Sequence, residues 1–205
     1  MGLLSPTVSV TRYKVEGKLE DPILDTIAKG LKENVIKDVD EDISEKKVGW
    51  TSFENPFMPD FRGSSFVIGT HMVFSLRIDK KVIPQKIIRK HYAIESAKRL
   101  AESGRQFLTR DEKKMIKDHV TDTLMLRIPS TPHLYDLIWD YDSSSLCFFS
   151  NLKSANEELE TLFSQSFQLS LIRLFPFTIA DLTMGLSDGE RDNLAKLSPT
   201  NLTAS

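Results

Sequence analysis

The chain has 205 residues, of which 40% are hydrophobic and 27% are charged, and its formal net charge is −2. These values are ordinary for a globular protein that buries a core of its own. The single cysteine, Cys147, excludes a disulfide framework within the chain, which suits a reducing cytoplasm. The longest apolar runs are too short to span a bilayer, and the N-terminal residues lack the pattern of a secretory signal, so we expect no membrane partner.

A strand and a helix are predicted first. Residues with β-branched side chains alternate with others from Thr7 to Val15, which favours a strand. Asp21 then suits the N-cap of a helix, and Pro22 suits its first turn. The buried face of this helix is predicted from a stripe with a spacing of four residues: Ile23, Ile27 and Leu31.

Two further strands are predicted, from Val48 to Phe53 and from His71 to Asp79. The segment between them contains Pro56, Pro59 and Gly63, and these residues are typical of a loop. The first part of the chain is therefore predicted to have the order strand, helix, strand, strand.

A pair of helices is predicted next. Pro84 begins a helical pattern that runs to Ser103, and Gly104 is a natural stop. The apolar residues of this helix do not keep to one face, so we expect it to leave the core partway, as an arm would. Thr109 and Glu112 form a capping box that begins the returning helix. The buried side of that helix is predicted to carry Ile116, Val120 and Leu124.

The remaining pattern returns to strands. Residues 133–142 and 146–150 predict a β-hairpin, in which we expect Trp139, like the earlier Trp50, to be a core residue. Ser154 and Glu157 form a second capping box, which predicts the start of another helix. The inward residues of that helix are predicted to be Ala155, Leu159, Leu162 and Phe163. A last strand is predicted within residues 168–177.

This order of elements predicts an α+β fold, with an antiparallel or mixed sheet, helices packed on one face and an inserted basic helical hairpin arm. We assign residues 1–78 and 128–186 to an α+β core domain and residues 79–127 to the inserted hairpin. Residues 187–205 are expected to form a C-terminal tail that is partly disordered.

Charge is distributed unevenly along the chain. The stretch from Arg77 to Lys117 holds 13 basic and five acidic residues, a balance of +8, whereas the rest holds 14 basic and 24 acidic residues, a balance of −10. An asymmetry of this kind indicates an anionic partner, and its alternative is a solvated helical face.

The sequence contains no assembled catalytic site. It lacks the phosphate-binding, dinucleotide-binding, nucleophile-elbow and zinc-protease motifs. A metal-dependent nuclease needs carboxylates that converge on a divalent ion. The acidic run at residues 38–42 is expected to be a solvated loop, and Asp136, Asp140 and Asp142 are expected to be the wet side of a strand. We therefore expect a protein that is not an enzyme and binds no metal and no cofactor.

Several stretches in order resemble the RdgC family of bacterial recombination-associated proteins. They are KVGW (Lys47–Trp50), SLRIDKKVIPQKII (Ser75–Ile88), the basic helical pair, the stretch at 124–167, and LIRLFP (Leu171–Pro176). No single motif is specific, but the ordered set runs from about Val8 to Pro176 and so covers most of the chain.

The resemblance implies an α+β fold and DNA binding with little sequence preference. Members of the family form dimeric rings around duplex DNA and restrain RecA-promoted strand exchange by occupying DNA. They commonly extend further at the C-terminus, so an open clamp or a monomer stays open beside the expected homodimer. The resemblance thus implies a nucleoid-associated cytoplasmic protein with DNA, mainly double-stranded, and a RecA-related protein as partners. The family is sometimes labelled as an exonuclease, and a nuclease is the less favoured alternative.

The predicted DNA-binding residues are the cations of the hairpin. The first set lies at its base and first turns: Lys80, Lys81, Lys86, Arg89 and Lys90. The second set lies further along: Lys98, Arg99, Arg105, Arg110, Lys113, Lys114 and Lys117. Tyr92 and Phe107 are the only aromatic residues within the predicted hairpin. Contact with the backbone of a duplex is therefore favoured over stacking on the bases of a single strand. The alternative is a protein-interaction module whose arm binds an acidic partner.

Overall fold

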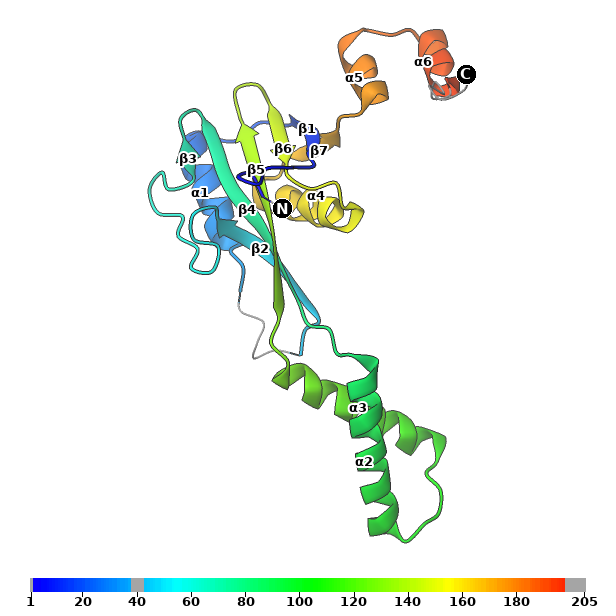
Figure 1. Ribbon diagram of the computed structural model, residues 1–205. Helices are drawn as coiled ribbons and strands as arrows, with labels where there is room; N and C mark the ends of the chain where they lie inside the picture. The colour runs from blue at the N-terminus through cyan, green and yellow to red at the C-terminus, as the bar shows by residue number, and fades with distance from the viewer. Residues whose placement is uncertain (1, 38–42, 198–205) are drawn as a thin grey trace.

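The structure is a computed structural model, and it describes residues 2–37 and 43–197 (Figure 1). An antiparallel sheet forms the middle of an elongated molecule, with a helical hairpin extending from one end and two short helices from the other. The predicted acidic loop at residues 38–42 and the last residues, 198–205, lie outside the described parts of the chain.

Thirteen helices and strands are present in these parts. They are β1 (Thr11–Glu16), α1 (Ile23–Glu33), β2 (Lys46–Ser52), β3 (Val67–Ile68), β4 (His71–Lys80), α2 (Gln85–Ser103), α3 (Arg110–Arg127), β5 (Thr131–Asp140), β6 (Ser145–Phe148), α4 (Lys153–Phe167), β7 (Ser170–Arg173), α5 (Pro176–Thr183) and α6 (Asp188–Lys196). The strand order is β2-β4-β5-β6-β1-β7, with β3 paired beside β4. All of these pairings are antiparallel, which confirms the α+β class and selects an antiparallel sheet.

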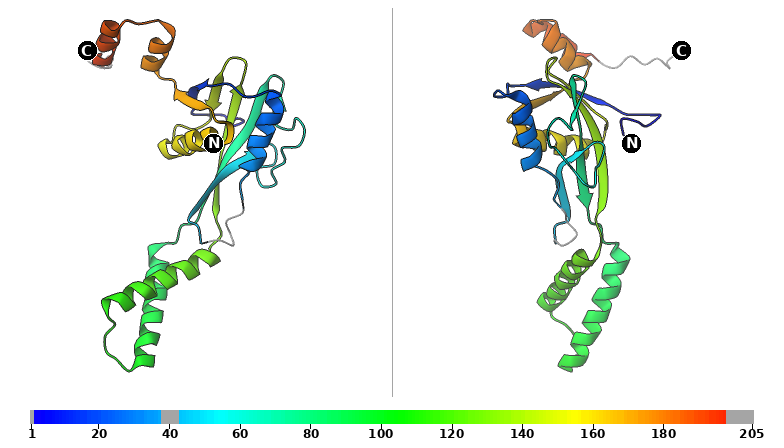
Figure 2. Two further views of the ribbon diagram at one scale, coloured as in Figure 1. Left: turned by 180° about the vertical axis from the view of Figure 1, so that it is seen from behind. Right: turned by 90° about the vertical axis from the view of Figure 1, so that its left-hand side faces the viewer.

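The core lies between the sheet and the two helices α1 and α4, which cover the same face (Figure 2). Trp50 of β2 and Trp139 of β5 are fully buried, as predicted. Trp50 meets Phe74 edge to face with ring centroids 5.1 Å apart, and Trp139 meets Phe163 of α4 at 4.9 Å. Such ring pairs add to the stability that burial of their area already provides. The sheet is therefore anchored to α4 through aromatic side chains.

The N-cap of α1 differs from the prediction. Ile27 and Leu31 are buried as expected, but the helix begins at Ile23 and its N-cap is Pro22, which has an extended backbone and no side-chain cap. Asp21 thus precedes the N-cap position and cannot satisfy the first amides of the helix.

The capping box predicted for α4 is also wrong. The helix begins at Lys153 and its N-cap is Leu152, so Ser154 already has helical backbone and is too far into the first turn to act as a cap. Asn156 instead donates from Nδ2 to the Leu152 carbonyl at 2.8 Å. The predicted inward residues of α4 are all buried: Ala155, Leu159, Leu162 and Phe163.

The chain beyond β7 contains two helices that the sequence did not predict. Pro176 occupies the first turn of α5, where its missing amide hydrogen is not needed. Ser187 and Glu190 form a capping box at the start of α6, with the Ser187 amide donating to the Glu190 carboxylate at 2.8 Å. Part of the expected tail at residues 187–205 therefore forms a helix, α6. Within the described residues, no helix has the length and apolar composition needed to cross a membrane.

Candidate nucleic-acid interface

The hairpin of α2 and α3 lies between β4 and β5 in the sequence, and it projects away from the sheet (Figure 1). A small apolar cluster holds its base together, separate from the core of the sheet. The buried members of this cluster are Ile83, Ile88, Val120, Leu124 and Met125. Because these residues come from both helices and from the connection after β4, the hairpin packs mainly on itself.

The turn at the far end of the hairpin has defined geometry. Gly104 ends α2 with a left-handed backbone at φ +62°, a conformation that favours glycine. The predicted capping box of α3 is present: the Glu112 side chain accepts from the Thr109 amide at 2.8 Å, and the Thr109 hydroxyl oxygen accepts from the Glu112 amide at 3.3 Å. Arg105 forms an ion pair with the same Glu112 carboxylate. The two ends of the turn are therefore held by one side chain.

The charge of Glu112 is stabilised by these contacts. The hydrogen bond from the Thr109 backbone, followed by the bond from Arg105, lowers the pKa of Glu112 from 4.5 to about 2. The carboxylate thus stays ionised over the whole physiological range. The charge of Arg105 is therefore already partly used within the hairpin.

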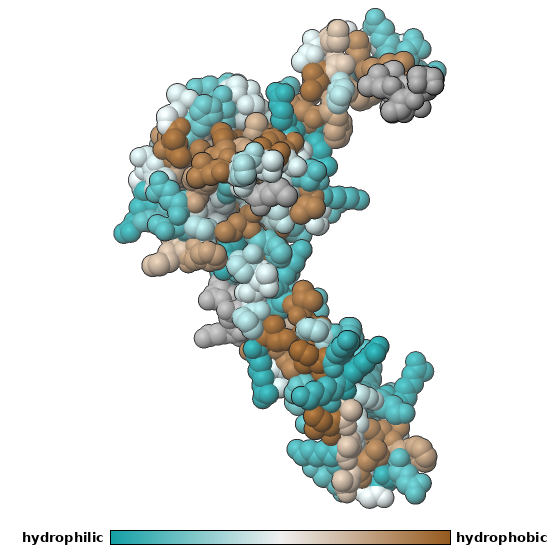
Figure 3. Space-filling view, in the orientation of Figure 1, coloured by the Kyte–Doolittle hydropathy of each residue, from teal (hydrophilic) through white to brown (hydrophobic). Residues whose placement is uncertain are grey.

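The predicted cations of the hairpin are mostly at the surface. Lys80, at the end of β4, is half-buried. Ten others are exposed: Lys86, Arg89, Lys90, Lys98, Arg99, Arg105, Arg110, Lys113, Lys114 and Lys117. Hydrophilic side chains cover much of the arm in Figure 3, with apolar residues between them. Among the residues that the structure describes, Arg105 alone of these ten makes an ion pair. The remaining nine cations form no ion pair with any carboxylate in residues 2–37 and 43–197.

Lys81 differs from the other predicted cations because it is buried. Only 3% of this residue is exposed, and its Nζ donates to the Met125 carbonyl of α3 at 2.9 Å. Met125 lies in the last turn of α3, where backbone carbonyls have no helical partner and attract cations. Lys81 therefore ties the end of β4 to the end of α3. The sequence could not show this contact, because it depends on how α3 returns to the sheet.

Arg77, which begins the basic stretch, likewise bonds to a group within the protein. Its guanidinium donates to both carboxylate oxygens of Asp79, at 2.7 and 2.6 Å, and Asp79 is fully buried. The pair contributes no net charge to the surface. The positive surface of the hairpin thus begins beyond Lys81.

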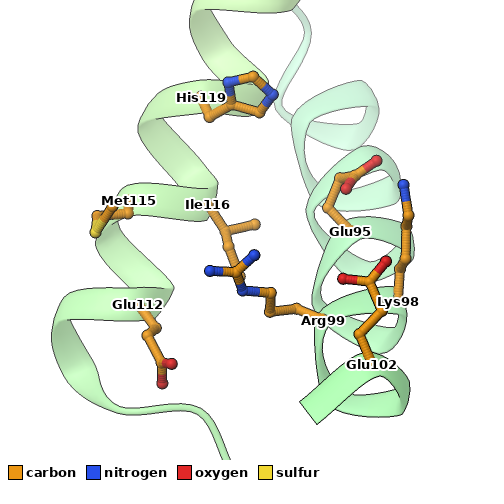
Figure 4. A pocket seen from close by; sticks show the side chains of 8 residues that line it. All are labelled: Glu95, Lys98, Arg99, Glu102, Glu112, Met115, Ile116 and His119. Carbon is orange, nitrogen blue, oxygen red and sulfur yellow. The ribbon is translucent and has the colours of Figure 1, made fainter.

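A cleft of about 290 Å³ separates the outer parts of α2 and α3 (Figure 4). Six of its eight lining residues are of charged or polar types: Glu95, Lys98, Arg99, Glu102, Glu112, Met115, Ile116 and His119. Figure 4 shows Arg99 reaching from α2 towards α3, so its guanidinium lies in the cleft and not on the outer surface of the arm. Arg99 is therefore the exposed cation that the geometry favours least for contact with a partner.

Two of the described carboxylates that were considered for a metal site have other hydrogen-bond partners. Asp136 accepts hydrogen bonds from the Ser75 hydroxyl at 2.7 Å and from the Leu3 amide at 2.7 Å. Asp140 accepts a hydrogen bond from the Ser143 amide at 3.2 Å, and its hydrogen bonds with Ser143 lower the pKa of the Asp140 carboxyl. In residues 2–37 and 43–197, no group of three or more His, Cys, Asp or Glu side chains is arranged to hold a metal ion.

The fold and this surface define a class: an α+β protein with an antiparallel sheet and an exposed, cation-rich helical hairpin. A family model described as "Putative exonuclease, RdgC" matches residues 9–184. The chain therefore belongs to the RdgC family of recombination-associated proteins, and the resemblance seen in the sequence is confirmed. A comparison with curated proteins finds no match.

Proposed function

We propose that this protein binds duplex DNA without sequence preference and limits RecA-promoted strand exchange by occupying the DNA. The observation that carries the proposal is the set of ten exposed cations on one hairpin, nine of which have no ion pair among the described residues. Lysine and arginine side chains that neutralise phosphates release condensed counterions, and this release supplies most of the free energy of nonspecific binding. Such binding would place the protein on the nucleoid.

The residue types on the hairpin favour contact with phosphates over reading of bases. Direct reading of bases uses asparagine, glutamine or arginine in a fixed orientation on a helix that enters the major groove. Here the cations are spread along two helices that project together as one arm (Figure 1). Lysine acts as a flexible point charge, which suits a backbone whose charge is the same at every sequence. The proposal is therefore binding that ignores sequence.

We further propose that the protein acts without catalysis and as a homodimer. Occupying DNA needs no chemical step. Asp136, one of the carboxylates that a nuclease would use, is already held by Ser75 and Leu3. The labelled duplex recovered from binding reactions with Mg²⁺ should keep its full length.

Three neighbouring cations at the start of α2 provide the test. Replacing Lys86, Arg89 and Lys90 by Gln should weaken binding of a labelled duplex of scrambled sequence, measured by fluorescence anisotropy across a salt series. The slope of log affinity against log salt should become shallower by up to about 2.7, since each lost phosphate contact removes about 0.9.

The matched control replaces Lys29, Lys32 and Lys153 by Gln, which removes the same charge from α1 and α4. This variant should keep the wild-type salt slope. Wild-type protein that binds no duplex even at about 50 mM salt, where phosphate contacts are least screened, would contradict the proposal.

A second candidate function comes from the charge balance of the chain, in which +8 on residues 77–117 faces −10 on the rest. The hairpin could then bind an acidic surface of another protein or of a second copy. Sedimentation of the triple hairpin variant separates the two functions. Loss of DNA affinity at unchanged particle size favours DNA binding, whereas dissociation with unchanged DNA affinity favours the interaction module.

A further inference from the structure

The connection between α2 and α3 lies at the end of the arm farthest from the sheet (Figure 1), and it contains one aromatic residue. Phe107 is 80% exposed, whereas its neighbour Leu108 is buried. The other aromatic of the hairpin, Tyr92, is half-buried on α2. The turn therefore exposes Phe107 to solvent and buries the residue after it, Leu108.

The backbone around Phe107 is held in place. Arg105 before it and Thr109 after it both bond to the Glu112 carboxylate, the latter through its amide at 2.8 Å and its hydroxyl at 3.0 Å. Gly104 supplies the left-handed residue that ends α2. A side chain presented by a braced turn loses less freedom on binding than one on a loose loop, so its contact is stronger.

Three exposed cations follow Phe107 along the chain. Arg110 begins α3, and Lys113 and Lys114 lie in the next turn of that helix; all three are exposed and without an ion pair in the described structure. An exposed aromatic ring with such cations close to it in the chain fits a partner with both phosphates and flat apolar faces. Bases that are not stacked on a neighbour have these properties.

We propose that Phe107 stacks on an unstacked base, so that the hairpin distinguishes a gapped or frayed duplex from an intact one. Insertion between two intact base pairs requires breaking their stacking, which offsets what one ring can gain. At a gap the stack is already interrupted, and the ring meets an open base face without that cost. The flanking cations hold the phosphates on both sides. This proposal rests on the proposed function and adds a preferred form of DNA to it.

The test compares the binding of an intact duplex with that of the same duplex lacking one nucleotide of one strand. Wild-type protein should bind the gapped duplex about five- to tenfold more tightly, the effect of stacking one base. Phe107→Ala should remove this preference and leave affinity for the intact duplex and its salt slope unchanged, because the cations remain. Phe107→Trp should retain the preference. A 2-aminopurine opposite the gap should change its fluorescence on binding the wild type and not the alanine variant.

Met58→Ala is the matched control, because Met58 is also 80% exposed but lies in the loop between β2 and β3. It should behave as the wild type does on both DNAs. Phe107 is exposed, so its replacement should leave the thermal unfolding of the protein unchanged.

Each other outcome has a distinct meaning. Wild-type protein that binds both DNAs equally overturns this proposal and leaves the proposed function standing, whereas wild-type protein that binds neither overturns both. Equal weakening on the two DNAs by Phe107→Ala also overturns the stacking role. A change in particle size with an unchanged preference for the gap would assign Phe107 to a contact between proteins.

Discussion

Glu112 is the residue on which the geometry of the turn depends, since it joins Arg105, Thr109 and the first turn of α3. Its pKa is lowered from 4.5 to about 2 in the folded protein. A carboxylate with a depressed pKa contributes stability above its unfolded pKa and loses it as the pH falls through the folded value. The turn should therefore loosen between about pH 4.5 and pH 2 and be unaffected by pH above that window.

The amide of Thr109 reports this transition, because it donates to the Glu112 carboxylate. Its NMR chemical shift should titrate in that acidic window in the wild type. In Glu112→Gln the capping geometry is retained by the amide oxygen, but the titration should be absent. A Thr109 shift that titrates equally in both proteins would show that another group controls the turn.

At the scale of elements, the hairpin and the sheet are separate packing units. Leu124 belongs to the apolar cluster at the base of the hairpin, and Leu159 belongs to the core between α4 and the sheet. Leu124→Ala should cost about 2–3 kcal/mol, near the lower limit for such a truncation because the cluster is small. The loss should appear as faster hydrogen exchange in α2 and α3 and not in β4 or β5, since local units can open independently.

Leu159→Ala is the comparison for this prediction. Leu159 is fully buried in the larger core, so its truncation should speed exchange across the whole sheet. If Leu124→Ala also speeds exchange throughout the sheet, the hairpin and core unfold together and the two-unit description is wrong. If exchange in Leu124→Ala is faster in the hairpin alone, then variants that destabilise the hairpin keep a folded core.

Most helices and strands could be predicted from the sequence, because at those places local signals and tertiary packing favour the same structure. The ends of α2 and the capping box of α3 were found because glycine and the Thr–Glu spacing have local mechanisms. The start of β1 was placed too early, since Thr11 pairs with Phe148, the last residue of β6, and the ladder can extend no further. The burial of Lys81 depends on a carbonyl far along the chain, which no local pattern encodes.

At the scale of the whole molecule, the helical hairpin that carries most of the basic stretch projects away from the sheet (Figure 1). A protein that binds DNA through such an arm should inhibit RecA-promoted strand exchange by covering duplex. Inhibition should then follow the ratio of protein to DNA and should be relieved by competitor duplex. Inhibition should weaken as the salt concentration rises. The release of counterions from the DNA is then less favourable, so the affinity of the protein for DNA falls.

The triple variant at Lys86, Arg89 and Lys90 decides whether inhibition acts through DNA. In a strand-exchange assay it should inhibit less than the wild type by the same factor that separates their duplex affinities. The control variant at Lys29, Lys32 and Lys153 should inhibit fully, because those cations lie on the core helices α1 and α4. Full inhibition by the hairpin variant, in spite of weakened DNA binding, would mean that the protein acts on RecA itself. The charge of the arm would then serve a protein partner.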